Sequence, residues 1–426
     1  MRKFLQLSVA LLAAASLATP LGAQTPEQVA AAALEAAPVW DGHNDVPEQL
    51  RDRYRNVLAD FDFTDTTNVP TGGGDSSRMH TDLPRLRQGK VGAQFWSVYV
   101  SAALPDPEAT VAVMEQIDVM KRVIARYPDD LALALNAGDV ERAREAGKIA
   151  SLLGMEGGNA LSGSLAVLRQ FYDLGARYLT LTHSKTLDWA DSATDAPMHD
   201  GLTEFGEQVV REMQRIGMLV DLSHTSEATM MDALDVAQES GGGAPVIFSH
   251  SGARAIDGHP RNVPDSVLAR LKDNGGIVMV VAYPSYVSEA VRQRNADLAA
   301  EQARLEALWL GQPDQVKAGI EQWEAAHPAV LATVSDVADH VDHIRQVAGI
   351  DHIGLGGDYD GMETGPQSIE DVTGYPALFV ELARRGYSQA DLEKIASRNM
   401  MRVLRAAEAY AAAHASDPVI ETPLAE

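Results

Sequence analysis

The chain contains no cysteine in its 426 residues. Disulfide bonds, iron–sulfur clusters, catalytic thiols and cysteine zinc sites are therefore excluded. Any metal ion that the protein binds must be held by histidine, aspartate or glutamate. These residue types are plentiful, since the sequence has 12 histidines and 60 acidic residues.

Positive charge is scarce as well. Lysine and arginine number 35 against 60 aspartates and glutamates, so the formal net charge is −25 at pH 7. Phosphate binding needs a basic surface, and we therefore expect no nucleic-acid partner. The hydrophobic share of 46% is enough for a large folded core.

The apolar run at the N-terminus, residues 4–18, is shorter than the roughly 20 residues of a membrane span. It follows Arg2 and Lys3 and precedes a small-residue stretch at 20–24, which is the pattern of a secretory signal peptide. We predict cleavage after Ala23 and export to the periplasm or the medium. Residues 417–426 carry no hydrophobic tail, so no membrane anchor is expected.

Residues 24–426 contain no internal repeat and no linker rich in proline or serine, and we predict that they form one domain. Eight short, mostly continuous apolar runs follow one another along this part. Such runs are typical of parallel strands that are buried on both faces. They lie at residues 38–45, 92–100, 148–155, 176–182, 218–223, 244–249, 276–282 and 352–357.

Helix-like stretches separate the runs, at residues 107–126, 162–174, 203–216, 225–238 and 264–272. Repeated alternation of strand and helix predicts an α/β fold, a parallel (β/α)8 barrel of the TIM type. Two segments do not fit the alternation. Residues 61–80 are polar and glycine-rich, and we predict a surface loop. Residues 288–328 are long, charged and helical in pattern, and we predict a helical insertion after strand seven that overhangs the barrel mouth.

Active sites of such barrels gather at the C-terminal ends of the strands. Seven side chains able to carry chemistry fall at these ends: His43, Asp45, Glu156, His183, His224, His250 and Asp358. Residues two apart on a strand face the same side, so His43 and Asp45 can hold one cation together. One histidine at a strand end is usually structural, but only barrel closure would bring all seven together. The set therefore predicts a metal site.

The ligand types indicate which metal binds. Imidazole and carboxylate without thiolate suit zinc, with manganese, cobalt or iron as substitutes. Five side chains of these types are more than one tetrahedral zinc can bind. Two zinc ions that share a carboxylate fit better. Glu156 is the expected bridge, because a carboxylate has two oxygens whereas an imidazole has one free lone pair.

These residues and their order resemble the membrane (renal-type) dipeptidase family of zinc metallopeptidases. The resemblance covers about residues 38–408. It is carried by WDGHND at 40–45, QFWSVY at 94–99, GMEGG at 154–158, RYLTLTH at 177–183, DLSH at 221–224, FSHS at 248–251, RNVPD at 261–265 and GGDYDG at 356–361.

The resemblance implies a (β/α)8 barrel and a role for each site residue. His43 and Asp45 would bind one zinc, His224 and His250 the other, and Glu156 would bridge the two. His183 would contact the scissile carbonyl, Arg261 would bind the substrate's terminal carboxylate, and Asp358 would shuttle the proton. Apart from the resemblance, we expect Tyr286, just before the insertion, to help hold that carboxylate. A metal-bridging hydroxide would hydrolyse small dipeptides, some with a D-residue at the C-terminal position, with β-lactams as a side activity. We also hypothesise a homodimer.

Two alternatives stay open. The first is another binuclear amidohydrolase that acts on a different amide, lactone, ester or β-lactam, in which Arg261 would have no carboxylate to bind. The second is a non-catalytic binding protein with the same fold.

Several other residues are interpreted as structural. His340 and His343 are expected to be exposed on a polar helix at 335–347, and the glycines at 354–357 to form a turn after the last strand. Trp96 and Tyr99 are expected to pack in the barrel, His352 to be structural and His259 to lie in a loop near the pocket. Asp360 is either a partner of Asp358 or a turn residue.

Overall fold

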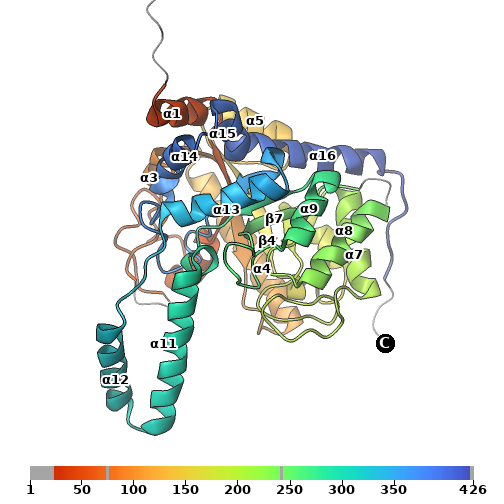
Figure 1. Ribbon diagram of the computed structural model, residues 1–426. Coiled ribbons are helices and arrows are strands. Elements are labelled where there is room, and N and C mark those ends of the chain that lie inside the picture. The colour runs from red at the N-terminus through yellow and green to blue at the C-terminus, as the bar shows by residue number, and fades with distance from the viewer. Residues whose placement is uncertain (1–23, 73–75, 240–242, 423–426) are drawn as a thin grey trace, which may run out of the picture.

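The computed structural model describes residues 24–72, 76–239 and 243–422. The predicted signal peptide, residues 1–23, lies outside the described residues. Eight parallel strands form a closed barrel, in which β2 pairs with β1 on one side and with β4 on the other (Figure 1). These strands are β1 (Val39–Asn44), β2 (Val91–Tyr99), β4 (Ile149–Glu156), β5 (Ala176–Thr180), β6 (Leu219–Asp221), β7 (Ile247–Ser251), β8 (Ile277–Val280) and β9 (Ile353–Leu355).

All eight predicted strands are confirmed, each within a few residues of its expected bounds. Their residues are buried almost throughout, which explains the continuous apolar pattern in the sequence. A further strand, β3 (Leu131–Leu133), pairs in parallel with the start of β4 and was not predicted. It is only three residues long, too short for a periodic pattern to stand out.

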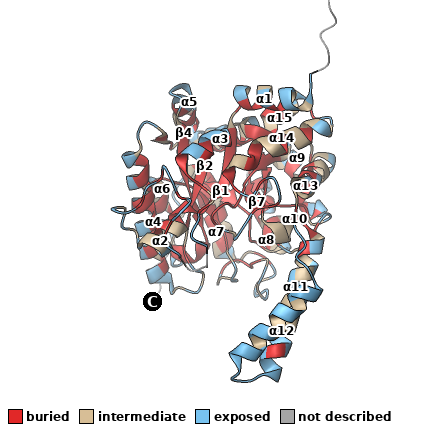
Figure 2. Ribbon diagram, turned by 90° about the vertical axis from the view of Figure 1, so that its left-hand side faces the viewer, coloured by how far each residue is buried: buried red, intermediate tan, exposed pale blue. Residues whose placement is uncertain are grey.

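Helices surround the barrel, and Figure 2 shows the buried strands at the centre of this ring. They are α1 (Pro26–Ala36), α2 (Val46–Tyr54), α3 (Leu83–Gln88), α4 (Asp106–Arg126), α5 (Ala137–Glu145), α6 (Leu165–Leu174), α7 (Glu204–Ile216), α8 (Glu227–Glu239), α9 (Asp265–Asn274), α10 (Pro284–Val287), α11 (Glu289–Leu308), α12 (Pro313–Ala326), α13 (Val334–Val347), α14 (Tyr375–Arg384), α15 (Gln389–Glu393) and α16 (Asn399–Ala413).

Local sequence signals set the ends of these helices. Thr203 caps α7 by accepting a hydrogen bond from the backbone of Gly206, and Gly217 ends the helix with a φ of 82°. Gly175 ends α6 in the same left-handed conformation, with a φ of 115°. Each helix therefore stops where the chain must turn back into the next strand of the barrel.

The insertion after β8 is a two-helix arm, made of α11 and α12, that projects away from the barrel (Figures 1 and 2). Its helical character is confirmed, but the prediction that it overhangs the mouth is wrong. No residue of either helix lines the cavity at the strand ends. The two helices pack on each other, and α12 has no buried residue.

Residues 61–80 run without a helix or strand where the structure describes them, but they are not simply a surface loop. Phe61 and Phe63 are fully buried in the hydrophobic core, and Met79 joins them. Thr66 is buried as well, and its hydroxyl accepts a hydrogen bond from Arg85. The polar composition of the segment hides these few apolar anchors, so the surface prediction was wrong for them.

His340 is also buried, contrary to prediction. Its Nδ1 accepts a hydrogen bond from the backbone N–H of Ala253 at 2.7 Å, and its Nε2 donates to the carbonyl of Val287 at 3.2 Å. The ring fits closely beside Gly252, where a Cβ atom would lie only 2.7 Å from Nδ1. His343, one turn away, instead pairs with Asp265 at 2.7 Å.

Across the described parts of the chain, no helix has both the length and the apolar character needed to cross a membrane.

Candidate active site

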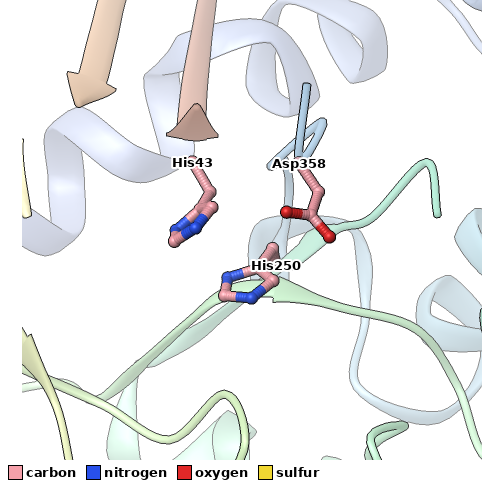
Figure 3. A group of neighbouring side chains, drawn as sticks. All are labelled: His43, His250 and Asp358. Atoms are coloured by element: carbon pink, nitrogen blue, oxygen red, sulfur yellow. The ribbon is translucent and has the colours of Figure 1, made fainter. Parts of the chain in front are cut away.

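The seven predicted strand-end residues come together at one end of the barrel. Figure 3 shows three of them, with His43 at the end of β1, His250 in β7 and Asp358 in the loop after β9 pointing toward one another. The rings of His43 and His250 lie 3.8 Å apart, centroid to centroid. Both histidines are 1% exposed and Asp358 is 7% exposed, so the group is almost closed to bulk solvent.

Glu156, the last residue of β4, lies between two sets of imidazoles. Its Oε2 is 3.3 Å from Nε2 of His43, while its Oε1 is 3.0 Å from Nε2 of His224 and 3.5 Å from Nε2 of His250. Ser97 on the neighbouring strand β2 donates a hydrogen bond to Oε2 at 3.0 Å. One carboxylate thus presents one oxygen to each set, which is the arrangement expected of a bridging ligand.

Asp45 completes the set around His43. Its Oδ1 is 3.4 Å from Nε2 of His43, and its Oδ2 is buried without a hydrogen-bond partner. A Cβ atom on Gly361 would lie 2.3 Å from Oδ2 of Asp45 and 2.7 Å from Oδ1 of Asp358. The absence of a side chain at Gly361 therefore lets these two carboxylates approach each other.

Two site residues have left-handed backbone conformations that L-residues seldom adopt. His224 has a φ of 66° and Asp358 a φ of 62°. Such strain persists only where the surroundings hold it, and it concentrates at functional sites. Here it turns both side chains inward at points where the chain has already left the strand.

The hydrogen bonds of His250 leave its Nε2 free to coordinate. Ser249 donates to Oδ2 of Asp221 at 2.6 Å, so its oxygen accepts from Nδ1 of His250 at 2.8 Å. With the proton on Nδ1, the lone pair of Nε2 points into the site. Asp221 is held in turn by the backbone N–H groups of Ser223 and Ser249.

Tyr178 on β5 has the same relation to His43. Its hydroxyl lies 2.9 Å from Nδ1 of His43, and burial raises the pKa of Tyr178 so that it stays neutral. Burial opposes protonation of His43, but Tyr178, Glu156 and Asp45 outweigh it and raise the pKa of this ring well above its usual value. A metal ion must displace this proton from His43, because only the neutral imidazole coordinates.

The pKa shifts of His224, His250 and Glu156 suit cation binding, whereas the shift of Asp358 favours a protonated carboxyl. Burial and nearby positive groups, Arg261 among them, hold the pKa values of His224 and His250 well below normal. Burial opposes ionisation of Glu156, but the histidines around it outweigh this and hold its pKa well below normal. Burial and the charge of Asp45 raise the pKa of Asp358. Neutral imidazoles and an ionised carboxylate are the forms that bind a metal ion.

The donor set fits metal ions. Three groups of ligand atoms each lie within 4.8 Å of one another: His43, Asp45 and Glu156; Glu156, His224 and His250; and His43, His250 and Asp358. The first two groups share Glu156 and are the two predicted ligand sets. The unpartnered Oδ2 of Asp45 and the facing Nε2 atoms of His224 and His250, 3.0 Å apart, would be satisfied by a cation.

Arg261 follows β7 and lies in the same cavity, which has a volume of about 280 Å³. Its side chain is 1% exposed and donates to two neutral groups, the carbonyl of His250 at 3.1 Å and the hydroxyl of Ser251 at 3.4 Å. Its Nε is buried without a partner, and its guanidinium lies 5.4 Å from the ring centre of Tyr286. This cation has no carboxylate partner among the described residues, although a buried charge is costly without one.

The sequence profile of the membrane dipeptidase family, peptidase family M19, matches residues 27–417. The chain belongs to this family. Dipeptidase 3 of Macaca fascicularis is 42% identical over 384 residues, which are 89% of this chain and 67% of the relative. The dipeptidase tcpJ of Claviceps purpurea is 42% identical over 381 residues, 87% of this chain and 77% of the relative.

Solved structures agree with the barrel. The probable dipeptidase PvdM of Pseudomonas aeruginosa superposes with a TM-score of 0.73 at 22% identity, over 90% of this chain and 99% of its own. The metallopeptidase described as dipeptidase AC gives a TM-score of 0.68 at 25% identity, over 87% and 98%. The protein is thus a metal-binding dipeptidase of the membrane dipeptidase family with a (β/α)8 barrel.

His183 lies on the cavity wall of this dipeptidase. Its Nε2 is 3.8 Å from Oε1 of Glu156, and its ring packs between His224 and Tyr99, with centroid distances of 4.2 and 4.5 Å. Burial lowers the pKa of His183, which favours the neutral ring. A neutral imidazole can donate one hydrogen bond from the nitrogen that carries its proton.

The cavity also contains residues that sequence analysis missed. Glu48, Thr194 and Tyr283 line it, and so does Tyr99, which was expected only to pack in the barrel. Trp96 is fully buried, as expected of a packing residue. Burial and the charges of Asp45 and Asp52 raise the pKa of Glu48 to about 9. Glu48 lies three residues beyond Asp45 on α2, and only the helix that begins there turns it toward the site.

The remaining candidates lie outside the cluster. Asp360 is buried and accepts a hydrogen bond from the backbone N–H of His80 at 2.7 Å, which secures a loop. Among the described residues, it makes no hydrogen bond with Asp358. His259 stacks on Tyr286 at 4.4 Å, beside the cavity but not lining it. His352 bonds the carbonyl of Gly276 at 2.8 Å, which is a structural role.

Proposed function

We propose that the protein is a binuclear zinc dipeptidase that hydrolyses small dipeptides with a free amine and a free carboxylate. The observation that carries the proposal is Arg261. Its buried guanidinium has no carboxylate partner among the described residues, yet it shares a cavity with the metal-ligand cluster. The planar fork of an arginine suits a carboxylate, which it binds through two parallel hydrogen bonds.

We assign one zinc ion to His43 and Asp45 and the other to His224 and His250, with Glu156 shared. This assignment rests on the opposite directions in which the two oxygens of Glu156 face. When bound, two such ions supply a polarised substrate carbonyl and a water made acidic enough to attack it. Imidazole and carboxylate ligands suit zinc, and manganese or cobalt are its expected substitutes.

The chain's own side chains bind the substrate, stabilise the developing charge and transfer the proton. Arg261, with Tyr286 beside it, fixes the substrate's C-terminal carboxylate and so sets the distance to the reacting bond. His183 donates a hydrogen bond to the oxygen that gains charge as the carbonyl is attacked. Asp358 faces His43 and His250 within the cluster, and it carries the proton from the attacking water to the departing amine.

Replacing Arg261 tests this proposal directly. Arg261→Ala should raise KM for a free dipeptide at least about ten-fold, because it removes a charge-assisted bond made in the bound state. The same dipeptide with an amidated C-terminus should be a poor substrate for the wild type, and the substitution should change its kcat/KM little. Equal losses on both substrates would show that Arg261 does not bind the carboxylate, and would favour a different amide or lactone as the substrate.

Other features of the function remain predictions. Acceptance of a D-residue at the C-terminal position is tested by comparing L-Ala-L-Ala with L-Ala-D-Ala, and β-lactam opening by the loss of ring absorbance. Export is tested by finding Gln24 at the N-terminus of protein recovered outside the cytoplasm. A homodimer is tested by the mass of the protein in solution.

A further inference from the structure

The loop between β7 and α9 brings Arg261 to the cavity through a tight turn at residues 259–262. The backbone N–H of Asn262 donates to the carbonyl of His259 at 3.0 Å, so Pro260 and Arg261 are the two central residues of this turn. Proline suits the first central position, because its fixed φ is the one that such turns require there. The local sequence therefore sets where the backbone of Arg261 lies.

The ring of His259 makes a further bond inside the turn. Its Nδ1 accepts the backbone N–H of Arg261 at 3.1 Å. Burial, with the charges of Arg261 and Arg292, lowers the pKa of His259 to about 4, so the ring is neutral at neutral pH. Nδ1 then keeps its lone pair for this bond, and Nε2 carries the proton. His259 thus holds Arg261 at its backbone without adding a second positive charge beside the cavity.

The same ring also contacts Tyr286, the second group proposed to hold the substrate's carboxylate. The ring centres of His259 and Tyr286 are 4.4 Å apart, and Tyr286 stacks on Tyr283 at 4.3 Å. Both tyrosines line the cavity of the metal-ligand cluster, and the guanidinium of Arg261 lies 5.4 Å from the ring centre of Tyr286. One imidazole therefore contacts two groups that follow different strands of the barrel, β7 and β8.

The backbone of His259 is held in turn by the base of the arm. Its N–H donates to Oδ1 of Asp257 at 2.8 Å, and Nε of Arg292 on α11 lies 3.4 Å from the same oxygen. Asp257 is fully buried. Glu289, also on α11, pairs with Arg292 at 2.5 Å and accepts a bond from the backbone N–H of Gly258 at 3.2 Å. The ring of His259 therefore contacts the carboxylate site from a fixed backbone.

We propose that His259 is a positioning residue for the substrate's carboxylate, holding Arg261 through Nδ1 and Tyr286 through its ring. The proposal rests on the dipeptidase function above and adds to it a residue outside the cavity lining. An arginine that is held in place before the substrate arrives loses less conformational freedom on binding. The effect therefore falls on KM rather than on kcat, and only for substrates with a free carboxylate.

His259→Phe tests the proposal, because phenylalanine keeps a ring beside Tyr286 and removes the acceptor. We expect KM for a free dipeptide to rise about five-fold with kcat within about two-fold, as the loss of one hydrogen bond predicts. The kcat/KM of the same dipeptide with an amidated C-terminus should change little. His259→Asn restores an acceptor for the N–H two residues on, as asparagine does in turns, so its KM should lie closer to that of the wild type.

A double-variant cycle separates positioning from general damage. In an Arg261→Ala background, His259→Phe should have no further effect on KM, because the group that it positions is already absent. The matched control is His327→Phe, an exposed ring that stacks on Trp323 at 4.3 Å outside the cavity lining. It should leave both kinetic constants unchanged. Zinc content and melting temperature, measured on each variant, identify a damaged site.

Each outcome has a distinct meaning. An unchanged KM in His259→Phe, or equal losses on the free and amidated dipeptides, overturns the positioning role. So does an equal effect in the wild-type and Arg261→Ala backgrounds, or a His259→Asn variant no better than His259→Phe. The dipeptidase function still stands in these cases if Arg261→Ala raises KM for the free dipeptide alone. If Arg261→Ala does not, the assignment of the carboxylate to Arg261 fails and this inference fails with it.

Discussion

At the scale of single residues, the orientation of each imidazole depends on the partner of its outer nitrogen. The Ser249–Asp221 pair places the proton of His250 on Nδ1, and the Tyr178 hydroxyl lies at the corresponding nitrogen of His43. A histidine that coordinates a metal usually has such a partner, which fixes the ring and strengthens the ligand. We therefore expect these second partners to contribute to metal affinity.

Tyr178→Phe tests that share. The ring would still fill its place against Gly154, where a Cβ atom would lie 2.0 Å from the tyrosine ring, but His43 would lose its hydroxyl partner. We expect zinc affinity to fall about 10- to 100-fold, with activity lost at limiting zinc and recovered at excess zinc. Competition with a chelator of known affinity measures the change.

Tyr410→Phe on α16 is the matched control for this experiment, because its hydroxyl makes no hydrogen bond to a described residue and Tyr410 does not line the cavity of the metal-ligand cluster. It should leave zinc affinity unchanged. An equally unchanged affinity in Tyr178→Phe would show that the hydroxyl does not support His43.

The inner residues of the site could be predicted from the sequence, but the residues that support them could not. The ligand candidates were visible because a histidine or glutamate ends one predicted strand after another. They are His43, Glu156, His224 and His250. Tyr178 and His43 are 135 positions apart, and nothing in an apolar strand pattern shows that a hydroxyl will meet an imidazole. Glu48 was missed for a similar reason, since a glutamate in the first turns of a helix is ordinary.

At the scale of elements, the arm formed by α11 and α12 is separate from the chemistry. Neither helix contributes a residue to the cavity that holds the metal-ligand cluster, and Arg294 lies close to His327 where the arm leaves the barrel. Replacing residues 297–325 with a short Gly-Ser linker should leave kcat/KM for dipeptides within about two-fold, as for a change away from packed or functional contacts. A steady-state assay with circular dichroism as the folding control measures this. A folded variant with greatly reduced activity would show that the arm acts on the site.

Helix α13 is attached to the barrel through His340, which is buried and neutral in the folded state. Burial lowers the pKa of His340 to about 4, and a protonated Nδ1 could no longer accept the bond from Ala253. The unfolded chain takes up this proton near pH 6.5, so between pH 6.5 and 4 it binds more protons than the folded state does. Stability is therefore lost as the pH falls through that window, by about 3 kcal/mol for this group.

His340→Gln should flatten this part of the pH dependence. Glutamine can accept from Ala253 and donate to Val287 without titrating. Urea unfolding at pH 7 and at pH 4.5 should show a smaller loss of stability for the variant than for the wild type. Equal losses in the two proteins would contradict a neutral buried His340.

The eight barrel strands and their helices were predictable because burial on both faces gives each strand a continuous apolar run. The arm and the loop at residues 61–80 lack such a pattern, so their positions could not be predicted. The arm has the same charged helical pattern as a helix pair that packs over a barrel mouth. This pattern does not specify the direction in which the arm leaves the barrel. The loop that carries Phe61 and Phe63 contributes two aromatic residues to the core from a polar segment.

At the scale of the whole molecule, the negative net charge and the buried ligand cluster both attract cations. The net charge of −25 gives the protein a field that attracts cations. The ligand cluster and this field both favour metal ions. Arg261 is the exception within the cavity, and we propose that it binds the one negatively charged group of a dipeptide.

The central claim is that two zinc ions, sharing Glu156 at the barrel mouth, enable this chain to cleave dipeptides. The most direct measurement is a zinc titration of the chelated protein, with bound zinc and dipeptide hydrolysis recorded on the same samples. We predict no hydrolysis without metal and a rise that ends at two zinc ions per chain, while Glu156→Gln binds less zinc and stays inactive. Full activity in the chelated protein, or saturation at one zinc ion with the second position empty, would contradict the account.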